Sequence, residues 1–469
     1  MNKQARQLWG FSLALAAVAL TQLPGAAQPA QPPNIIFILV DDLGWTDLGC
    51  QGSKFYETPN IDRLAREGMR FTQAYSACTV CSPTRAALMT GKYPARLHVT
   101  DWIRGHDYPK AKLKVPDWTM CLPLEERTIA EVLKEAGYAT ASIGKWHLGG
   151  RQFYPDKQGF DVNLGGCDKG QPPSYFSPYG IPTLPDGPPG EFLSDRLTDE
   201  AIKFIEQNKA KPFFVFVPHY AVHTPLMGKS NVVAKYRAKA DTNSPQRNAQ
   251  YAALVESVDD SVGRLLRRLD ELRLAENTVI FFTSDNGGLV LNDVTSNRPL
   301  RAGKGSAYEG GVRVPLIVKW PRMTQPGSVC GTPVITPDFF PTLLEVAGLS
   351  SSPQSVLDGE SLVPLLRQSG KLKRDAIYWH YPHYHPGGAT PHSAIRDGDW
   401  KLIEFFEDNR VELYNLKDDI GEQADLAAKW PQQAKQLRER LQAWRRQVGA
   451  QMPTPNPDYA AVGNGPPPP

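Results

Sequence analysis

The sequence predicts an α/β protein: a large, mostly parallel sheet flanked by helices, and then a smaller C-terminal α+β subdomain that carries an antiparallel sheet. Short apolar runs recur after residue 33 and alternate with amphipathic segments, which is typical of buried parallel strands connected by helices. Beyond residue 355, strand-like runs follow one another directly, as antiparallel strands do. A chain of 469 residues is long enough for both units.

The elements of the first unit are predicted in chain order. Residues 34–40 (NIIFILV) form a strand, and residues 58–68 form a helix with Gly68 as its C-terminal stop. Thr128 and Glu131 have the spacing of a capping box and start a second helix. Further strands are predicted at residues 138–144, 212–218, 278–284 and 314–321.

The longest helix and the C-terminal unit follow from the same patterns. One buried helical face is predicted from apolar residues at steps of three and four, namely Leu254, Val258, Val262, Leu265, Leu269 and Leu272. Strand-like runs at 375–381, 393–405 and 410–416 precede a helix at 431–448. We therefore expect an α/β domain at 33–355, a subdomain at 356–450, and a Pro-rich tail at 451–469 that is an extended arm or disordered.

The first 27 residues have the pattern of a secretory signal peptide. Lys3 and Arg6 precede a short apolar run at 11–20 and small residues suited to cleavage. We therefore expect a secreted or periplasmic protein with no membrane anchor. Removing these two cations lowers the formal net charge from +3 to +1, which does not describe a nucleic-acid-binding protein.

Six cysteines in a secreted chain are usually interpreted as disulfide partners. If Cys81 is used for other chemistry, five cysteines remain and at least one is unpaired within the monomer. The pairing cannot be deduced from their positions.

Unusual polar residues follow four of the predicted strands. Because the C-terminal edge of a parallel sheet is where ligands bind, these residues are expected to meet in one crevice. They are Asp41 and Asp42 after the first strand, Lys145 and His147 after the second, His219 and His223 after the third, and Asp285 and Asn286 after the fourth.

The acidic members of this set predict a metal site. Asp41, Asp42, Asp285 and Asn286 offer only oxygen ligands, which favour Ca²⁺ or Mg²⁺ over Zn²⁺. Carboxylates gathered at one site repel each other unless a cation is present. The alternative is that both pairs only form turns.

The basic members predict an anionic substrate. A tetrahedral anion needs several donors directed at its oxygens and a group that protonates the leaving atom. The alternative for any one of these side chains is simple solvation. The candidates are Arg85, Lys145, His147, His223 and Lys304.

Residues 78–91 (CTVCSPTRAALMTG) contain two cysteines three positions apart. A redox pair would require a thioredoxin-like context, and a zinc knuckle would require a second ligand pair that the sequence does not provide. Pro83 suits the first turn of a helix, which places Cys81 at a helix N-terminus, where the dipole favours anions.

The stretch from Cys81 to Gly91 resembles the signature of the type I, formylglycine-dependent sulfatases, an arylsulfatase-like family of the alkaline phosphatase superfamily. The motifs LVDDLGW, GKWHLG, HTPL, SDNGG and GKGSAYEGGVRVP are also similar to motifs of that family and occur in the same order. The resemblance extends from Asn34 to the C-terminal helix.

The resemblance implies a fold, an activity and a set of roles. A separate formylglycine-generating enzyme would convert Cys81 to formylglycine, and calcium would be bound by Asp41, Asp42, Asp285, Asn286 and residue 81. One hydroxyl of the hydrated aldehyde would attack sulfur, and the second would expel sulfate. His223 and Lys304 would assist the leaving oxygen, His147 would deprotonate the second hydroxyl, Arg85 would steady residue 81, and Lys145 would hold the sulfate.

The aromatic tract near residue 380 is the candidate for substrate binding. His380, His383, His385 and Arg396 lie among tyrosines and tryptophans, which suit a sugar ring, although the same pattern is expected of a subdomain core. We therefore expect a sulfatase that acts on a sulfated carbohydrate, either a glycosaminoglycan or an algal galactan. The rival interpretations are a phosphonate or phosphodiester hydrolase of the same superfamily and a non-catalytic binder of sulfated glycans.

Overall fold

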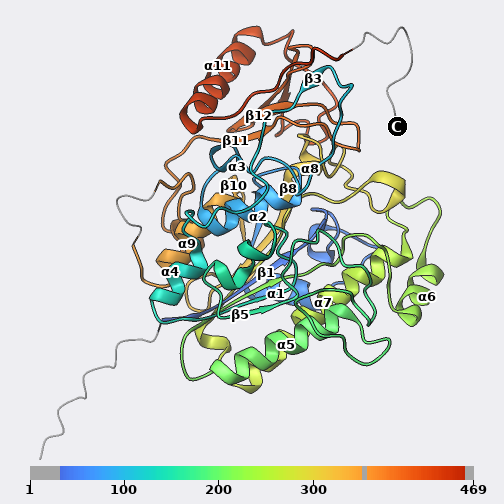
Figure 1. The fold of residues 1–469 in the computed structure, drawn as a ribbon, viewed down its shortest axis with the longest axis vertical. Coiled ribbons are helices and arrows are strands. Elements are labelled where there is room, and N and C mark those ends of the chain that lie inside the picture. The colour runs from blue at the N-terminus through green and yellow to red at the C-terminus, as the bar shows by residue number, and fades with distance from the viewer. Residues whose placement is uncertain (1–31, 351–355, 460–469) are drawn as a thin grey trace, which may run out of the picture. The chain divides into compact units, whose positions relative to one another are not determined.

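The main sheet of the computed structural model, which describes residues 32–350 and 356–459, contains nine strands in the described part of the chain. Their order is β10-β2-β8-β7-β1-β6-β4-β5, with β9 beside β2. Strands β1, β5, β8 and β10 of this sheet are labelled in Figure 1. All described pairings are parallel except those of β8 with β2 and β7, which confirms the predicted, mostly parallel sheet. The bounds are β1 Asn34–Val40, β2 Met69–Tyr75, β4 Ala139–Ile143, β5 Val162–Leu164, β6 Phe213–Pro218, β7 Thr278–Ser284, β8 Arg313–Lys319, β9 Ser328–Cys330 and β10 Val334–Ile335.

Helices cover both faces of this sheet because alternate residues of the buried strands point to opposite sides. Ile36 and Ile38 of β1 pack in one apolar cluster, and Ile35 and Phe37 pack in another. The first cluster includes α1 Pro59–Glu67, α5 Leu193–Asn208, α6 Ser230–Lys239 and α7 Ala249–Glu271. The second includes α2 Cys81–Thr90, α4 Ile129–Glu135, α9 Phe339–Val346 and α10 Val363–Leu366.

Two predicted helix ends have different physical causes. The Thr128 hydroxyl accepts a hydrogen bond from the Glu131 amide, and the Glu131 carboxylate accepts one from the Thr128 amide, so the predicted capping box starts α4. Gly68 follows α1 but is extended rather than left-handed, with φ −123° and ψ −156°. A Cβ at Gly68 would lie 2.5 Å from the Val318 carbonyl oxygen, so a close approach to β8 is what requires glycine here.

The C-terminal part forms a second, antiparallel sheet, as predicted. Strands β11 Ala376–Tyr381, β12 His392–Asp397, β13 Trp400–Phe405 and β14 Val411–Asn415 pair in sequence order. Helix α11 Pro431–Val448 packs on this sheet through Leu437, Leu441 and Trp444. The same cluster contains Tyr75 of β2, so the two sheets share apolar contacts.

The chain ends are described in part. The signal peptide predicted at 1–27, the boundary predicted at 355 and residues 460–469 lie outside the described residues. Within the Pro-rich tail, β15 Thr454–Pro455 pairs in antiparallel fashion with β3 Leu113–Lys114. A search of the described residues finds no helix that is both long and apolar enough to cross a bilayer.

A buried ionic cluster connects the two sheets. The Lys401 Nζ on β13 lies 2.9 Å from an oxygen of Glu309, in α8 Glu309–Val312, and 3.0 Å from an oxygen of Glu422. Tyr75 donates a 2.7 Å hydrogen bond to the other oxygen of Glu309. Burial, with the Glu309 carboxylate nearby, raises the pKa of Glu422 to about 7. Lys401 is thus the cation that the two buried carboxylates share, and Arg313 pairs with Glu309 in addition, at 3.3 Å.

Replacing Lys401 is expected to destabilise the fold strongly. Lys401→Met leaves Glu309 and Glu422 without their shared cation, which should lower the free energy of unfolding by about 3–5 kcal/mol. Denaturant unfolding measures this loss. The matched control is Lys134→Met, which removes an exposed ion pair with Asp161 and should cost less than about 1 kcal/mol. Equal losses in the two variants would contradict the assignment.

Candidate active site

Four neighbouring strands bring the predicted polar residues to one edge of the main sheet. In the order β7-β1-β6-β4 all strands run parallel, so their C-terminal ends lie side by side. Asp41 and Asp42 follow β1, Asp285 follows β7, and Lys145 follows β4. All four side chains are buried, and the Lys145 Nζ lies 2.5 Å from Asp41, so these residues meet as predicted. We refer to this buried polar centre as the crevice.

Cys81 is the first residue of α2, as predicted from Pro83, and its side chain faces this crevice. The Cys81 Sγ lies 3.3 Å from Nδ1 of His147. The helix begins without a side-chain cap, so its first amide groups remain available to an anion near residue 81. The next residue, Ser82, connects α2 to the His147 backbone by donating a 2.9 Å hydrogen bond to the His147 carbonyl oxygen.

Arg85, one turn along α2, ties the helix to the acidic residues. Its Nε and Nη2 atoms donate to one oxygen of Asp285 at 2.9 and 2.7 Å, and Nη1 donates to the Lys145 carbonyl oxygen at 2.9 Å. Nη2 also lies 3.9 Å from Asp41. Burial acts to raise the pKa of Asp285, but the positive charges of Arg85 and Lys145 together outweigh it and lower that pKa. Arg85 therefore helps to keep Asp285 ionised.

Two lysines hold the adjacent aspartates. The Lys145 Nζ lies 2.5 Å from Asp41, and the Lys304 Nζ lies 2.7 Å from Asp42. Burial and the Asp285 carboxylate raise the pKa of Asp41 well above its usual value. Burial also acts to raise the pKa of Asp42, but Lys304 and His223 bring it below its ordinary value. The two neighbouring carboxylates therefore differ in how readily they release a proton.

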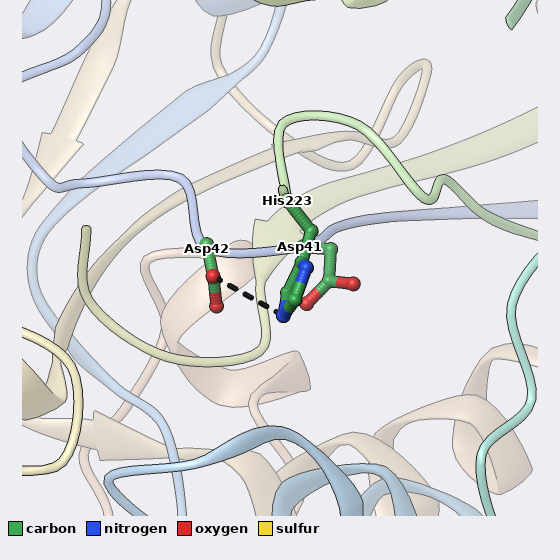
Figure 2. A group of neighbouring side chains, drawn as sticks. All are labelled: Asp41, Asp42 and His223. Atoms are coloured by element: carbon green, nitrogen blue, oxygen red, sulfur yellow. Dashed lines mark ion pairs between the residues drawn. The ribbon is translucent and has the colours of Figure 1, made fainter. Parts of the chain in front are cut away.

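The acidic set fits a hard divalent cation. Oδ1 of Asp41 and Oδ1 of Asn286 are buried oxygens without a hydrogen-bond partner among the described residues. Asn286 uses its Nδ2 to donate to Asp42 at 2.8 Å, which leaves its oxygen available. Ligand atoms of Asp41, Asp42 and His223 all lie within 4.8 Å of one another, and Figure 2 shows the imidazole of His223 directed toward the carboxylates. A cation would partner the two free oxygens and offset the repulsion between carboxylates.

The hydrogen bonds of His147 assign its tautomer. Nε2 lies within hydrogen-bond distance of the Ile103 carbonyl oxygen, so this nitrogen carries the proton, and Nδ1 presents its lone pair to residue 81. Burial, together with the positive charge of Lys145, lowers the pKa of His147 well below its ordinary value. The imidazole is therefore neutral and placed to accept a proton at Nδ1.

His223, not His219, lies in the crevice. Nδ1 of His223 donates to the Thr224 carbonyl oxygen at 2.9 Å, and Nε2 lies 3.6 Å from Asp42. His219 is turned toward α7, where its Nε2 lies 3.2 Å from the Ser261 hydroxyl. Burial lowers the pKa of His223 to about 3 and that of His219 to about 4. The choice of His223 from the HTP motif agrees with this placement.

Of the four residues expected to bind substrate, three have partners inside the protein and the fourth lies beside the Lys304 loop. His380 has internal partners at both nitrogens, Ser393 Oγ at 2.7 Å and the Gln451 carbonyl oxygen at 2.8 Å. His383 contacts Thr100 at 2.8 Å, and Arg396 donates to Tyr75 and Gln73.

This placement favours the core interpretation for His380, His383 and Arg396, since buried polar groups need such internal partners. His385 differs. A Cβ at Gly305 would lie 2.1 Å from His385 Nδ1, so this ring packs directly beside the loop that carries Lys304.

The structure contains no disulfide among the six cysteines, contrary to what is usual in a secreted chain. All six are free, including Cys78 and Cys81, which are buried. Burial raises the pKa of the Cys78 thiol to about 12, so this neighbour is a poor nucleophile. The interpretation of Cys78 and Cys81 as a redox pair receives no support.

Two residues that contact His147 could not be found from sequence patterns. Ile103 acts through its backbone carbonyl, for which no residue type is diagnostic. Gly170 lies against the imidazole, where a Cβ would be 2.6 Å from the ring. Both occur in segments without a recognisable motif, so only the folded chain reveals them.

This arrangement defines a class of enzyme. The site combines buried carboxylates suited to a cation, lysines beside these carboxylates, and a neutral histidine next to residue 81. Such a site can bind an anionic ester and catalyse its cleavage. Family comparison is more specific. A model of the sulfatase family matches residues 33–349, and a model described as N-sulphoglucosamine sulphohydrolase, C-terminal, matches residues 303–447.

Individual proteins agree with the family match. A sulfatase of Formosa agariphila is 36% identical, and the match covers 88% of this chain and 89% of the relative. N-acetylgalactosamine-6-sulfatase of Canis lupus familiaris is 37% identical, with 79% of this chain and 72% of the relative covered. The crystal structure of Ps i-CgsB in complex with k-i-k-neocarrahexaose has a TM-score of 0.75 at 32% identity, and covers 88% of this chain and 93% of that one.

The chain therefore belongs to the sulfatase family, the type I sulfatases of the alkaline phosphatase superfamily, and is a sulfuric ester hydrolase. The resemblance of the sequence motifs to this family is confirmed. The match to the family extends over both sheets.

The contact between Gly170 and His147 leads to a prediction. Gly170→Ala places a methyl group against the imidazole and displaces Nδ1 from residue 81, so kcat for sulfate release should fall by about 10²-fold, as expected for the loss of proton transfer. The control is Gly150→Ala, whose Cβ would meet only the flexible end of Gln152, at 3.3 Å. Steady-state kinetics on an aryl sulfate measures both, and equal rates would disprove the role of this contact.

Proposed function

We propose that this enzyme hydrolyses sulfate monoesters of a sulfated carbohydrate by means of formylglycine made from Cys81 and a bound calcium ion. The observation that carries the proposal is the position of Cys81. It lies at the uncapped N-terminus of α2, 3.3 Å from the acceptor nitrogen of His147, in the crevice that also holds Lys145 and Lys304. An aldehyde hydrate at this position offers two hydroxyls, one as nucleophile and one to expel sulfate.

The metal would be held by Asp41, Asp42, Asp285, Asn286 and residue 81. The unpartnered oxygens of Asp41 and Asn286 support this set, and its oxygen-only composition favours Ca²⁺, with Mg²⁺ as the alternative. Such an ion supplies Lewis acidity and neutralises the charge of the ester oxygens.

The protein's own residues have separable tasks. Lys145 brings a positive charge to the crevice and is suited to the sulfate oxygens. His147 accepts a proton at Nδ1 from residue 81, since Nε2 is engaged with Ile103. His223 exchanges a proton at Nε2, because its Nδ1 is engaged with Thr224, and together with Lys304 it serves the leaving oxygen. Arg85 fixes α2 relative to Asp285.

The carbohydrate substrate is supported by the names of the relatives. One relative is named for the 6-sulfate of N-acetylgalactosamine, and a neighbouring structure holds k-i-k-neocarrahexaose. A glycosaminoglycan or an algal galactan is therefore the proposed substrate class. The N-terminal pattern at 1–27 supports a secreted or periplasmic location, and the maturation partner would be a formylglycine-generating enzyme.

The modification is testable by mass spectrometry. Protein made in the native host, or together with a converting enzyme, is expected to give a tryptic peptide Phe71–Arg85 with the mass of formylglycine in place of Cys81. The Cys81→Ser variant provides the control, since a converting enzyme that requires cysteine leaves serine unchanged. An intact thiol in an enzyme that releases sulfate would disprove the proposed nucleophile.

The metal set is testable by calcium titration. Asp285→Asn and Asn286→Ala are each expected to weaken Ca²⁺ binding by about 10-fold or more in isothermal calorimetry, because each removes charge or an oxygen ligand from the site. Asp168→Asn is the matched control, since Asp168 is exposed and contacts Tyr154 instead. Unchanged calcium affinity in the first two variants would refute the assignment.

A further inference from the structure

Residues 102–114 lead from the catalytic crevice to the surface. At one end, the Ile103 carbonyl oxygen is the partner of His147 Nε2, and the Ile103 amide donates a 3.1 Å hydrogen bond to the Ser82 hydroxyl. At the other end, Lys114 belongs to β3. The segment therefore begins one side chain, His147, away from residue 81 and continues to the surface.

Three aromatic rings of the segment, together with Tyr384, form a row that we call the aromatic row. The three rings of the segment are those of Trp102, His106 and Tyr108. Trp102 and His106 lie edge to face with ring centres 5.0 Å apart, and His106 and Tyr108 are 6.0 Å apart. Tyr384, from the C-terminal part, continues the row 5.6 Å from Tyr108. His106 is exposed, and the other three rings are half-buried. Partly exposed aromatic rings next to a polar site suit the apolar faces of sugars.

The same segment is strongly basic. Arg104, Lys110, Lys112 and Lys114 are exposed, and Asp107 is its one acidic residue, so four positive charges less one negative charge leave +3. Within the described ranges, none of the four basic side chains forms an ion pair. Exposed lysines are usually only solvated. Here, however, they accompany an aromatic row that begins at the catalytic crevice, and this combination favours an anionic saccharide.

Contacts with the C-terminal part hold the segment in place. The Tyr384 hydroxyl accepts a 3.0 Å hydrogen bond from the Leu113 amide and donates one of 2.7 Å to Glu407. Asn456, in the Pro-rich tail, donates from Nδ2 to the carbonyl oxygens of Pro109 and Ala111 at 2.9 and 2.7 Å. A surface fixed before the ligand arrives loses less conformational entropy on binding.

We propose that residues 102–114 and Tyr384 form a second saccharide-binding subsite, which takes a further anionic sugar residue of the chain whose sulfate lies at residue 81. The inference rests on the proposed carbohydrate sulfatase function and makes it more specific. The substrate is a sulfated oligosaccharide or polysaccharide, and a single sulfated sugar leaves this subsite unused.

Kinetics on two chain lengths tests the proposal. The probes are N-acetylgalactosamine 6-sulfate, a hexasaccharide of chondroitin 6-sulfate and neocarrahexaose. The wild-type enzyme should prefer one of the hexasaccharides over the monosaccharide in kcat/KM. We expect the ratio of kcat/KM for the preferred hexasaccharide to kcat/KM for the monosaccharide to fall by about tenfold in Lys110→Ala/Lys112→Ala and in Tyr108→Ala. The fall should arise mainly from a higher KM for the hexasaccharide. In the lysine variant, this KM should also depend less on the salt concentration.

The matched control is Lys209→Ala/Lys211→Ala. These lysines are also exposed, but they precede β6 at the opposite edge of the main sheet and should leave the ratio unchanged. Calorimetric titration of the preferred hexasaccharide into Cys81→Ala enzyme, with and without the two lysine substitutions, measures binding without turnover and should show the same loss of affinity.

The outcomes separate the two proposals. If the wild-type enzyme hydrolyses the monosaccharide and a hexasaccharide, but the subsite variants retain the wild-type ratio and affinity, the subsite is disproved and the sulfatase function stands. If the wild-type enzyme hydrolyses an aryl sulfate but neither saccharide class, and no hexasaccharide binds, the carbohydrate function fails and the subsite fails with it.

Discussion

The repulsion between three buried carboxylates is the constraint on which the active site depends. Asp41, Asp42 and Asp285 are brought together by neighbouring parallel strands, where burial alone would protonate them. Arg85, Lys145 and Lys304 each contact one of these acids. The pKa values of Asp42 and Asp285 are lowered as a result, whereas that of Asp41 stays raised, so the crevice retains negative charge on Asp42 and Asp285. Removing any of these cations would leave a charge buried and unpaired, which proteins tolerate poorly. Catalytic chemistry and local stability therefore use the same ion pairs.

The two sheets contribute differently to this centre. The main sheet supplies the acids, the lysines and α2, because the C-terminal ends of β7, β1, β6 and β4 are adjacent. The C-terminal part fixes the loop that carries Lys304 at both ends. Before Lys304, Arg301 donates a 2.8 Å hydrogen bond to the Glu422 carbonyl oxygen. After Lys304, Glu309 forms an ion pair with Lys401 of the C-terminal sheet. His385 packs beside the same loop at Gly305. The position of Lys304 thus depends on residues far along the chain.

The sequence was sufficient to predict the main strands and the crevice, because apolar runs followed by Asp41 or Asp285 have a direct meaning in a parallel sheet. It was not sufficient for Ile103 and Gly170, which act through a carbonyl group and through the lack of a side chain. The tract around His380 had two interpretations in the sequence for a related reason. Aromatic and histidine residues occur both in sugar sites and in cores, and only the partners of His380 and Arg396 distinguish the two. Whether two cysteines form a disulfide likewise depends on their distance in the folded chain, which their spacing in the sequence does not reveal.

The central strand of the main sheet is also the first to be made. Ile35 of β1 is paired with Phe214 of β6 and Val279 of β7, so its partners leave the ribosome long after it does. Cys81 is only 2% exposed in the folded chain, so an enzyme that modifies residue 81 would have to reach it before β6 and β7 join β1. The order of the strands along the chain would thus limit the proposed conversion of Cys81 to the time before the main sheet is complete.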